Sequence, residues 1–345
     1  GLEERRNINT TTGVVDETVQ ATTLYQRGGD NEIIKASYIV NDNLSVSAMV
    51  ASNDYTRTDA GTGDVYNFIW WPYPSNSEGR ASQLVPGTGA DSRDVVKFDL
   101  DYYVGNHHFR VGMENSELVA QSFSNYSGSN AQAVASSLGY DNSDLTCGGV
   151  YYRGYDGDGD GTIVAGDRLR LRTYCAGGTF QTDQEVFYIQ DSWDVSDQLN
   201  LNIGIRRESY DNMNASGESF IKVENQDALR LGATYDIYGD GNDKLFASFG
   251  EYYLPVAANT NIRMAGSEYF SQQYCTWDGT VSNADDFIPG VTAGSCEDVS
   301  YYSDGSIPDA RGLKDQNIDP MYAEEFILGY STILNKGLFS GWDMN

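Results

Sequence analysis

Residues 95–114, VVKFDLDYYVGNHHFRVGME, decide the fold, because two alternating segments flank the dipeptide Gly105-Asn106. Apolar side chains occupy every second position of both segments, and polar side chains lie between them. The apolar set is Val96, Phe98, Leu100, Tyr102, Phe109, Val111 and Met113, and the polar set is Lys97, Asp99, Asp101, His108, Arg110 and Glu114. Since successive side chains of a strand point to opposite faces, this period of two predicts a β-hairpin with one apolar and one polar face.

The same alternation recurs four more times along the chain, each time around a short turn of polar residues and glycine. These turns lie at residues 41–43, 196–198, 239–242 and 335–337. Together with one further strand near residues 14–26, they predict an all-β, antiparallel sheet of about eleven strands.

Much longer connections separate the hairpins, at residues 55–93, 120–182, 210–224 and 255–320. Structureless loops of this length are uncommon in a compact soluble domain. Short turns at one end and long loops at the other are typical of outer-membrane β-barrels, whose turns are periplasmic and whose loops are extracellular. We therefore predict part of an antiparallel transmembrane β-barrel, with residues 120–182 and 255–320 as long extracellular loops.

The polar positions distinguish two kinds of sheet. In a barrel, Lys97, Asp99 and Asp101 facing Arg110 and Glu114 are expected to form cross-strand charge pairs in a wet lumen. A β-sandwich also alternates, but its apolar face packs on a second sheet. A secreted, calcium-bound β-sandwich module is therefore an alternative at this point.

Composition agrees with a β protein. The chain has 345 residues, of which 25 are Tyr, 37 are Gly and only 7 are Pro, a mixture that suits strands joined by tight turns. Mean hydropathy is −0.47, and no apolar run approaches the roughly 18 residues that a membrane helix needs. With 22 basic and 50 acidic residues the net charge is −28, so nucleic acid is not an expected partner.

Three stretches resemble a known family. Residues 185–207, EVFYIQDSWDVSDQLNLNIGIRR, resemble a barrel hairpin of TonB-dependent receptors, in which an aromatic-Gln-Asp-x-Trp strand turns into a Leu-x-Leu-x-x-Gly-x-Arg strand. Residues 244–253, KLFASFGEYY, and 319–330, DPMYAEEFILGY, resemble the Oar-like subgroup of these receptors. The resemblance covers about 183–256 and 315–334.

The resemblance implies a transport receptor in the outer membrane of a Gram-negative bacterium. Its barrel would have 22 strands, a plug domain and a TonB box through which the TonB complex supplies energy. Oar-like receptors also carry a carboxypeptidase-regulatory-like N-terminal domain. None of these parts is recognisable in residues 1–345, no signal peptide opens the chain, and Asn345 is not the terminal aromatic residue of such barrels, so we expect a barrel fragment. A surface adhesion barrel without transport is the alternative.

Residues 156–167, DGDGDGTIVAGD, fit the twelve-residue calcium loop. Gly161 stands at the sharp bend of position 6, Ile163 is the apolar residue at position 8, and Asp replaces the usual Glu at position 12. The predicted ligands of a structural calcium ion are Asp156, Asp158, Asp160, the carbonyl of Thr162, and Asp167. The alternative is an acidic turn that binds no metal.

Four cysteines allow three pairings. We expect Cys147–Cys175 and Cys275–Cys296, because each pair lies within one long connection, and such loop-stapling disulfides imply an oxidising, extracytoplasmic compartment. No Ser/His/Asp set, phosphate-cradling loop or Cys/His zinc pattern is present, so we do not expect an enzyme. The acidic loops disfavour anionic siderophores and suit a peptide, a protein or a cationic ligand, and the expected lipid partner is the outer membrane itself.

Overall fold

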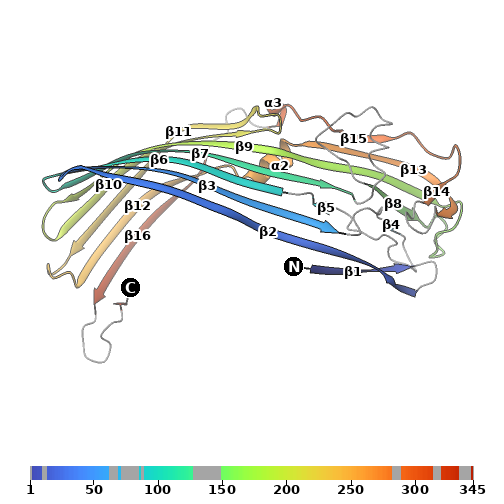
Figure 1. Ribbon diagram of the computed structural model, residues 1–345, viewed down its shortest axis with the longest axis horizontal. Helices are drawn as coiled ribbons and strands as arrows, with labels where there is room; N and C mark the ends of the chain where they lie inside the picture. Colours follow the sequence, from blue (N-terminus) through green and yellow to red (C-terminus); the bar gives the residue numbers. More distant parts are fainter. Residues whose placement is uncertain are drawn as a thin grey trace, which may run out of the picture.

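The computed structural model describes residues 2–9, 14–61, 69–70, 85–86, 89–126, 149–281, 289–313, 320–333 and 343–344. Within these ranges, most residues belong to one large β-sheet, and two short helices, α2 (Ala258–Met264) and α3 (Ala310–Leu313), lie beside it (Figure 1). Neither of these described helices has the length and apolar character that would be needed to cross a membrane.

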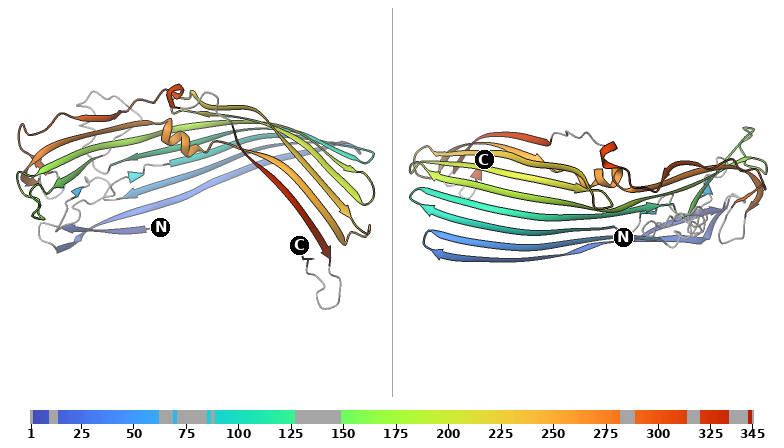
Figure 2. Two further views of the ribbon diagram at one scale, coloured as in Figure 1. Left: turned by 180° about the vertical axis from the view of Figure 1, so that it is seen from behind. Right: turned by 90° about the horizontal axis from the view of Figure 1, so that it is seen from above.

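Nine long strands form the wall of the sheet. They are β2 (Val14–Asn41), β3 (Leu44–Gly61), β6 (Gly89–Val104), β7 (His107–Asn125), β9 (Arg168–Asp194), β10 (Leu199–Met213), β11 (Ser219–Asp236), β12 (Asp243–Leu254) and β16 (Met321–Ile333). Each pairs antiparallel with the next in this order. The sheet is curved, and in the described part its two sides do not meet: β1 (Leu2–Asn9) borders β2, and β17 (Asp343–Met344) borders β16 (Figures 1 and 2). The fold is an open arch of antiparallel strands.

The predicted alternation holds across the wall, and it gives the sheet an apolar face and a polar face. On the apolar face, Ile205 lies between Ile189 and Leu229, and Ala247 lies between Ala233 and Leu328. Exposed members of this face are Ile34, Tyr38, Val50, Val96, Phe98, Met113, Phe187, Ile203, Leu231, Leu245, Phe326 and Leu328. No second sheet covers this face in the described part of the chain, so the β-sandwich alternative is not supported.

The polar face carries the expected cross-strand pairs. Asp101 lies directly opposite Arg110 in the register and accepts a hydrogen bond from its Nε at 2.8 Å. Within β6, Lys97 lies 3.8 Å from Asp99, and Tyr188 of β9 donates a hydrogen bond to the same aspartate. The prediction of charge pairs lining the polar face is confirmed.

The short turns lie together at one end of the sheet, and the long connections lie at the other (Figure 1). The end with the short turns holds the turns after β2, β6, β9 and β11, as the antiparallel order requires. Gly105 adopts a positive φ of 57° in the tight turn between β6 and β7, a conformation that costs glycine little. The fifth predicted turn, 335–337, lies outside the described residues.

The long connections contain far more strand than predicted. Residues 120–182 hold the end of β7, the strand β8 (Val150–Tyr155) and the first half of β9, and residues 255–320 hold both helices, β13 (Ser267–Val281), β14 (Pro289–Val291) and β15 (Ser300–Asp304). In residues 55–93, β3 continues to Gly61, and two short strands follow, β4 (Ile69–Trp70) and β5 (Val85–Pro86). Residues 210–224 are mostly strand around a tight turn, and 14–26 belongs to β2 rather than to a separate strand. The prediction that these connections lack regular structure was therefore wrong. Stretches such as Thr179–Gln184 carry polar residues on both faces and show no hydropathy period, and the Arg-Leu alternation of residues 168–172 was overlooked.

Small cores lie at the long-connection end of the arch. One consists of Phe180, Phe220, Ile221 and Ala265, so that the segment after α2 packs on β9 and β11. In the same region Asn212, which is fully buried, donates to the Val256 carbonyl at 2.9 Å. These contacts fix the chain segments that leave the wall.

Candidate functional site

Strand β9 carries the wall into the long-connection end. Its pairing with β7 runs from His107–Trp193 to Asn125–Cys175 without a register shift, so its even-numbered residues stay on the polar face. Further out, β9 is flanked by β8 on one side and by β13 on the other. We call β8, residues 168–178 of β9, β13 and β15 the outer segment.

A cavity of about 460 Å³ opens on the polar face of the wall. Its lining includes Lys97, Arg110, Tyr188, Asn202, Arg206, Arg230 and Ser248. Gly204 and Gly232 leave space between these side chains because neither has a Cβ. The cavity therefore offers a water-accessible surface inside the arch that carries four basic side chains.

The predicted calcium loop begins where β8 ends. Asp156 accepts hydrogen bonds from the backbone N–H groups of Gly159 (2.6 Å) and Gly161 (2.7 Å), and Asp160 accepts one from Thr162 N (2.7 Å). Carboxylate oxygens of Asp156, Asp158 and Asp160 lie within 4.8 Å of one another. That spacing suits one calcium ion, whose oxygen ligands lie roughly 2.3–2.6 Å from the metal.

The remaining predicted ligands are placed differently. Asp167 turns both carboxylate oxygens to the backbone, accepting from Gly157 N (3.2 Å) and Val164 N (2.8 Å), and it is not part of the group of three. The hydroxyl of Thr162 donates to Asp160 at 2.6 Å. The structure thus brings together three of the five predicted ligands, and Asp167 closes the loop through the backbone.

The hydrogen-bond pattern of this loop is not specific to calcium. In the turn after β11, Asp236 accepts from Gly239 N (2.9 Å) and Gly241 N (2.7 Å), and Asp240 accepts from Asn242 N (3.0 Å). The spacings are those of Asp156 and Asp160, yet Tyr238 stands where the calcium loop has its second aspartate. Asp158 and the closing Asp167 distinguish the loop at 156–167 from this ordinary turn.

Two features fix the loop and its charge. Ile163 packs on a core formed by Val150, Tyr152 and Leu169, which lie on the side of the outer segment away from the polar face. The backbone N–H of Gly161, and then that of Gly159, hold the pKa of the exposed Asp156 below its usual range. The loop therefore keeps its negative charge at neutral pH, and it lies apart from the polar face.

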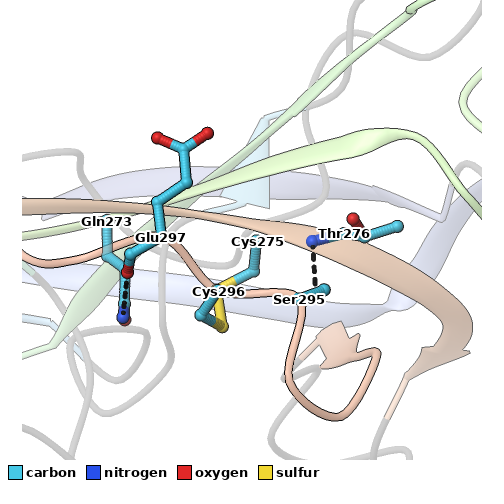
Figure 3. Close-up of a disulfide and its surroundings, with 6 residues drawn as sticks. All are labelled: Gln273, Cys275, Thr276, Ser295, Cys296 and Glu297. Atoms are coloured by element: carbon cyan, nitrogen blue, oxygen red, sulfur yellow. Dashed lines mark hydrogen bonds between the residues drawn. A yellow bond between two sulfur atoms is a disulfide. The ribbon is translucent and has the colours of Figure 1, made fainter.

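The predicted disulfide Cys275–Cys296 is confirmed, and it ties β13 to the segment before β15 (Figure 3). Hydrogen bonds flank it: Thr276 N donates to Ser295 Oγ at 3.0 Å, and Gln273 Nε2 donates to the Glu297 carbonyl at 2.9 Å. Cys175 is also disulfide-bonded, but Cys147 lies outside the described residues, so the pairing Cys147–Cys175 stays a prediction.

A group of arginines on the polar face of the outer segment was not identified from the sequence. Residues 168–172 read Arg-Leu-Arg-Leu-Arg, so three arginines share one face of β9, and Arg153 of β8 lies directly opposite Arg170. The arginine cluster comprises Arg153, Arg168, Arg170 and Arg172. The period-two repeat of arginine in so acidic a chain was the signal that could have revealed it.

Aromatic rings surround the cluster. The guanidinium carbon of Arg168 lies 3.8 Å from the ring centre of Tyr274, that of Arg172 lies 5.0 Å from Phe270, and that of Arg153 lies 4.9 Å from Tyr155. Stacking of this kind holds a guanidinium plane while leaving its N–H edge able to donate to a ligand. The outer segment therefore combines cations and flat apolar surfaces on one face.

The architecture is that of an antiparallel, outer-membrane type barrel wall, and comparison with known proteins agrees. Over 72 residues, 21% of this chain and 7% of the relative, it is 32% identical to the TonB-dependent transporter Oar of Myxococcus xanthus. The predicted resemblance to TonB-dependent receptors is confirmed over that stretch. No family model matches the chain.

The solved structures that resemble this chain include two outer-membrane receptors. The ferripyoverdine receptor of the outer membrane of Pseudomonas aeruginosa shares 10% identity with a TM-score of 0.26, covering 99% of this chain and 52% of that one. The alcaligin outer-membrane receptor FauA of Bordetella pertussis shares 10% identity with a TM-score of 0.24, covering 74% and 42%. The chain thus spans about half the length of these receptors or less. Similarity at such TM-scores does not assign a fold, so the assignment rests on the strand pairing.

Proposed function

We propose that this chain forms part of the barrel wall of a TonB-dependent transport receptor in the outer membrane of a Gram-negative bacterium. The observation that carries the proposal is the uncovered apolar face, on which Ile34, Phe326 and Leu328 are each 71% exposed. Water disfavours a continuous apolar face of this kind, whereas the hydrocarbon core of a bilayer accommodates it. The similarity to a TonB-dependent transporter supports the same reading.

In this proposal, the short turns lie in the periplasm, the apolar face contacts outer-membrane lipid, and the outer segment captures a ligand from the medium. Energy for its passage comes from the TonB complex, acting through a plug and a TonB box. A peptide or protein is the expected ligand. An adhesion barrel would share the wall but would act without TonB, so ligand capture and uptake compared in cells with and without TonB separate the two functions.

Orientation can be tested at the two ends of one strand. Asp197, in the turn before β10, and Ser216, in the turn after it, are both exposed. No free cysteine occurs in the described part of the chain, so single cysteines there should report alone. We expect a membrane-impermeant maleimide to label Ser216→Cys on intact cells and Asp197→Cys only after the outer membrane is permeabilised. Labelling of both on intact cells, or the reverse pattern, would contradict the proposal.

We further propose that Asp156, Asp158 and Asp160 bind a structural calcium ion, with the Thr162 carbonyl and Asp167 completing the loop. Three neighbouring carboxylates repel one another, and a divalent cation cancels that repulsion. Affinity should be modest, with a dissociation constant of roughly 10⁻⁴–10⁻³ M, as in extracellular calcium modules. Chelating calcium should therefore speed protease cleavage within residues 156–167 of the wild-type protein.

A matched pair of variants separates calcium binding from turn formation. Asp160→Ala should make cleavage of the loop fast with or without calcium, because one of the three carboxylates is lost. Asp240→Ala removes the corresponding residue of the similar turn after β11 and should leave the calcium response at 156–167 unchanged. Cleavage of the wild type that does not respond to calcium would show that the motif is only an acidic turn.

A further inference from the structure

Among the described residues, Arg170 of the arginine cluster is buried and has no carboxylate partner. Arg170 is only 7% exposed, and its Nε has no hydrogen-bond partner among the described residues. Its recorded contacts are with rings: the guanidinium carbon lies 5.3 Å from the ring centre of Tyr151 and 5.8 Å from that of Tyr155. Among the described residues, no carboxylate forms an ion pair with it.

The neighbouring arginines show that this is a local property. Arg168, two residues away on the same face, is paired with Glu297 at 2.6 Å. Arg172 donates to the neutral amide oxygen of Gln272 at 2.8 Å and stacks on Phe270. Among the described residues, Arg168 therefore has a carboxylate partner and Arg170 has none.

The register makes the missing anion more costly. Arg153 lies directly opposite Arg170 in the pairing of β8 with β9, and like charges directly opposite one another destabilise a sheet. A buried charge without a partner is also strongly unfavourable. The chain has 50 acidic residues against 22 basic ones, yet none of the acidic residues that the structure describes forms an ion pair with Arg170.

We propose that Arg153, Arg170 and Arg172 bind a carboxylate group of the receptor's ligand on the polar face of the outer segment. A guanidinium offers two parallel N–H donors that match the two oxygens of a carboxylate, and Tyr151 and Tyr155 hold the Arg170 plane so that little freedom is lost on binding. The identity of the ligand rests on the proposed receptor function. Binding itself does not, because it is measured on the isolated protein.

The test uses the full chain in detergent, with calcium present and ionic strength held constant with sodium chloride. Sodium succinate is the carboxylate probe, and sodium sulfate is the comparison oxyanion. Succinate should raise the thermal midpoint of the wild type, and Arg170→Met should weaken succinate binding at least tenfold. With neither succinate nor sulfate present, the Arg170→Met variant should unfold at the same temperature as the wild type or higher, because methionine, a side chain of similar shape, replaces a buried cation that has no carboxylate partner among the described residues.

Three other results would contradict the proposal. If Arg170→Met lowers the thermal midpoint when neither succinate nor sulfate is present, the arginine is a structural residue held by its aromatic contacts and the proposal fails. Stronger binding of sulfate than of succinate contradicts a carboxylate site, and binding of neither contradicts any anion site. Arg168→Gln is the matched control on the same face, and we expect its succinate affinity to stay within about twofold of the wild type because Glu297 already neutralises Arg168. None of these outcomes affects the cysteine-labelling test of membrane orientation, so the carboxylate site and the receptor function can fail independently.

Discussion

Replacing Leu231 with Arg is expected to lower the free energy of unfolding in a bilayer by about 2–4 kcal/mol, the cost of a cation at the midplane of the lipid face of a barrel. Leu231 is 40% exposed and lies between Ile203 of β10 and Phe249 of β12 in the register. These apolar neighbours offer the new guanidinium no anion. Reversible unfolding by denaturant in phospholipid vesicles measures the effect.

Asn202 provides the matched control for this substitution. It is paired with Gly232, the residue next to Leu231, so it lies at nearly the same height but on the polar face, where it lines the 460 Å³ cavity. Asn202→Arg should change the free energy of unfolding by no more than about 0.5 kcal/mol, as is usual for a solvated position. Equal costs at both positions would mean that the two faces meet the same solvent, and the barrel assignment would be wrong.

Removing the disulfide Cys275–Cys296 by the double substitution Cys275→Ser, Cys296→Ser is expected to destabilise the outer segment by about 3 kcal/mol. The bridge closes a loop with a sequence separation of 21, and on the chain-entropy model a loop of this size restricts the unfolded state by that amount. Proteolysis of the purified protein measures it, because cleavage between residues 275 and 296 should become much faster.

The wall serves as an internal reference for this variant. The strands from β2 to β7 make no use of the bridge, so their resistance to the same protease should not change. If cleavage between residues 275 and 296 stays as slow as in the wild type, then the hydrogen bonds of Thr276 and Gln273 alone hold the segment, and the entropic argument fails.

The wall was predictable from the sequence because one face of each strand is apolar and the other is polar. Hairpins such as β6–β7 place Phe98 and Met113 on one face and Asp99 and Gly112 on the other, and this contrast produces the period of two. Where the contrast disappears, the prediction fails. The stretch Thr179–Gln184 of β9, for example, has polar residues on both faces and one aromatic residue, Phe180, so its strand looked like a loop.

The candidate sites show a similar limit. The calcium motif singled out Asp156, Asp158 and Asp160, which the structure brings together, but it did not reveal the orientation of Asp167, because a motif does not record which oxygens the backbone already uses. The arginine cluster depends on pairing between β8 and β9, whose strands are separated by the loop 156–167. Only the register places Arg153 beside Arg170.

If the wall spans the outer membrane as proposed, the length of β9 sets how far the protein reaches from the cell. Its 27 residues, at about 3.3 Å each, measure roughly 90 Å, and only the part from Phe187 onward belongs to the exposed apolar face. With a strand tilt of about 40°, Arg172 stands on the order of 40 Å above the bilayer. In the proposed orientation, the arginine cluster would therefore meet a ligand well before that ligand reaches the lipid.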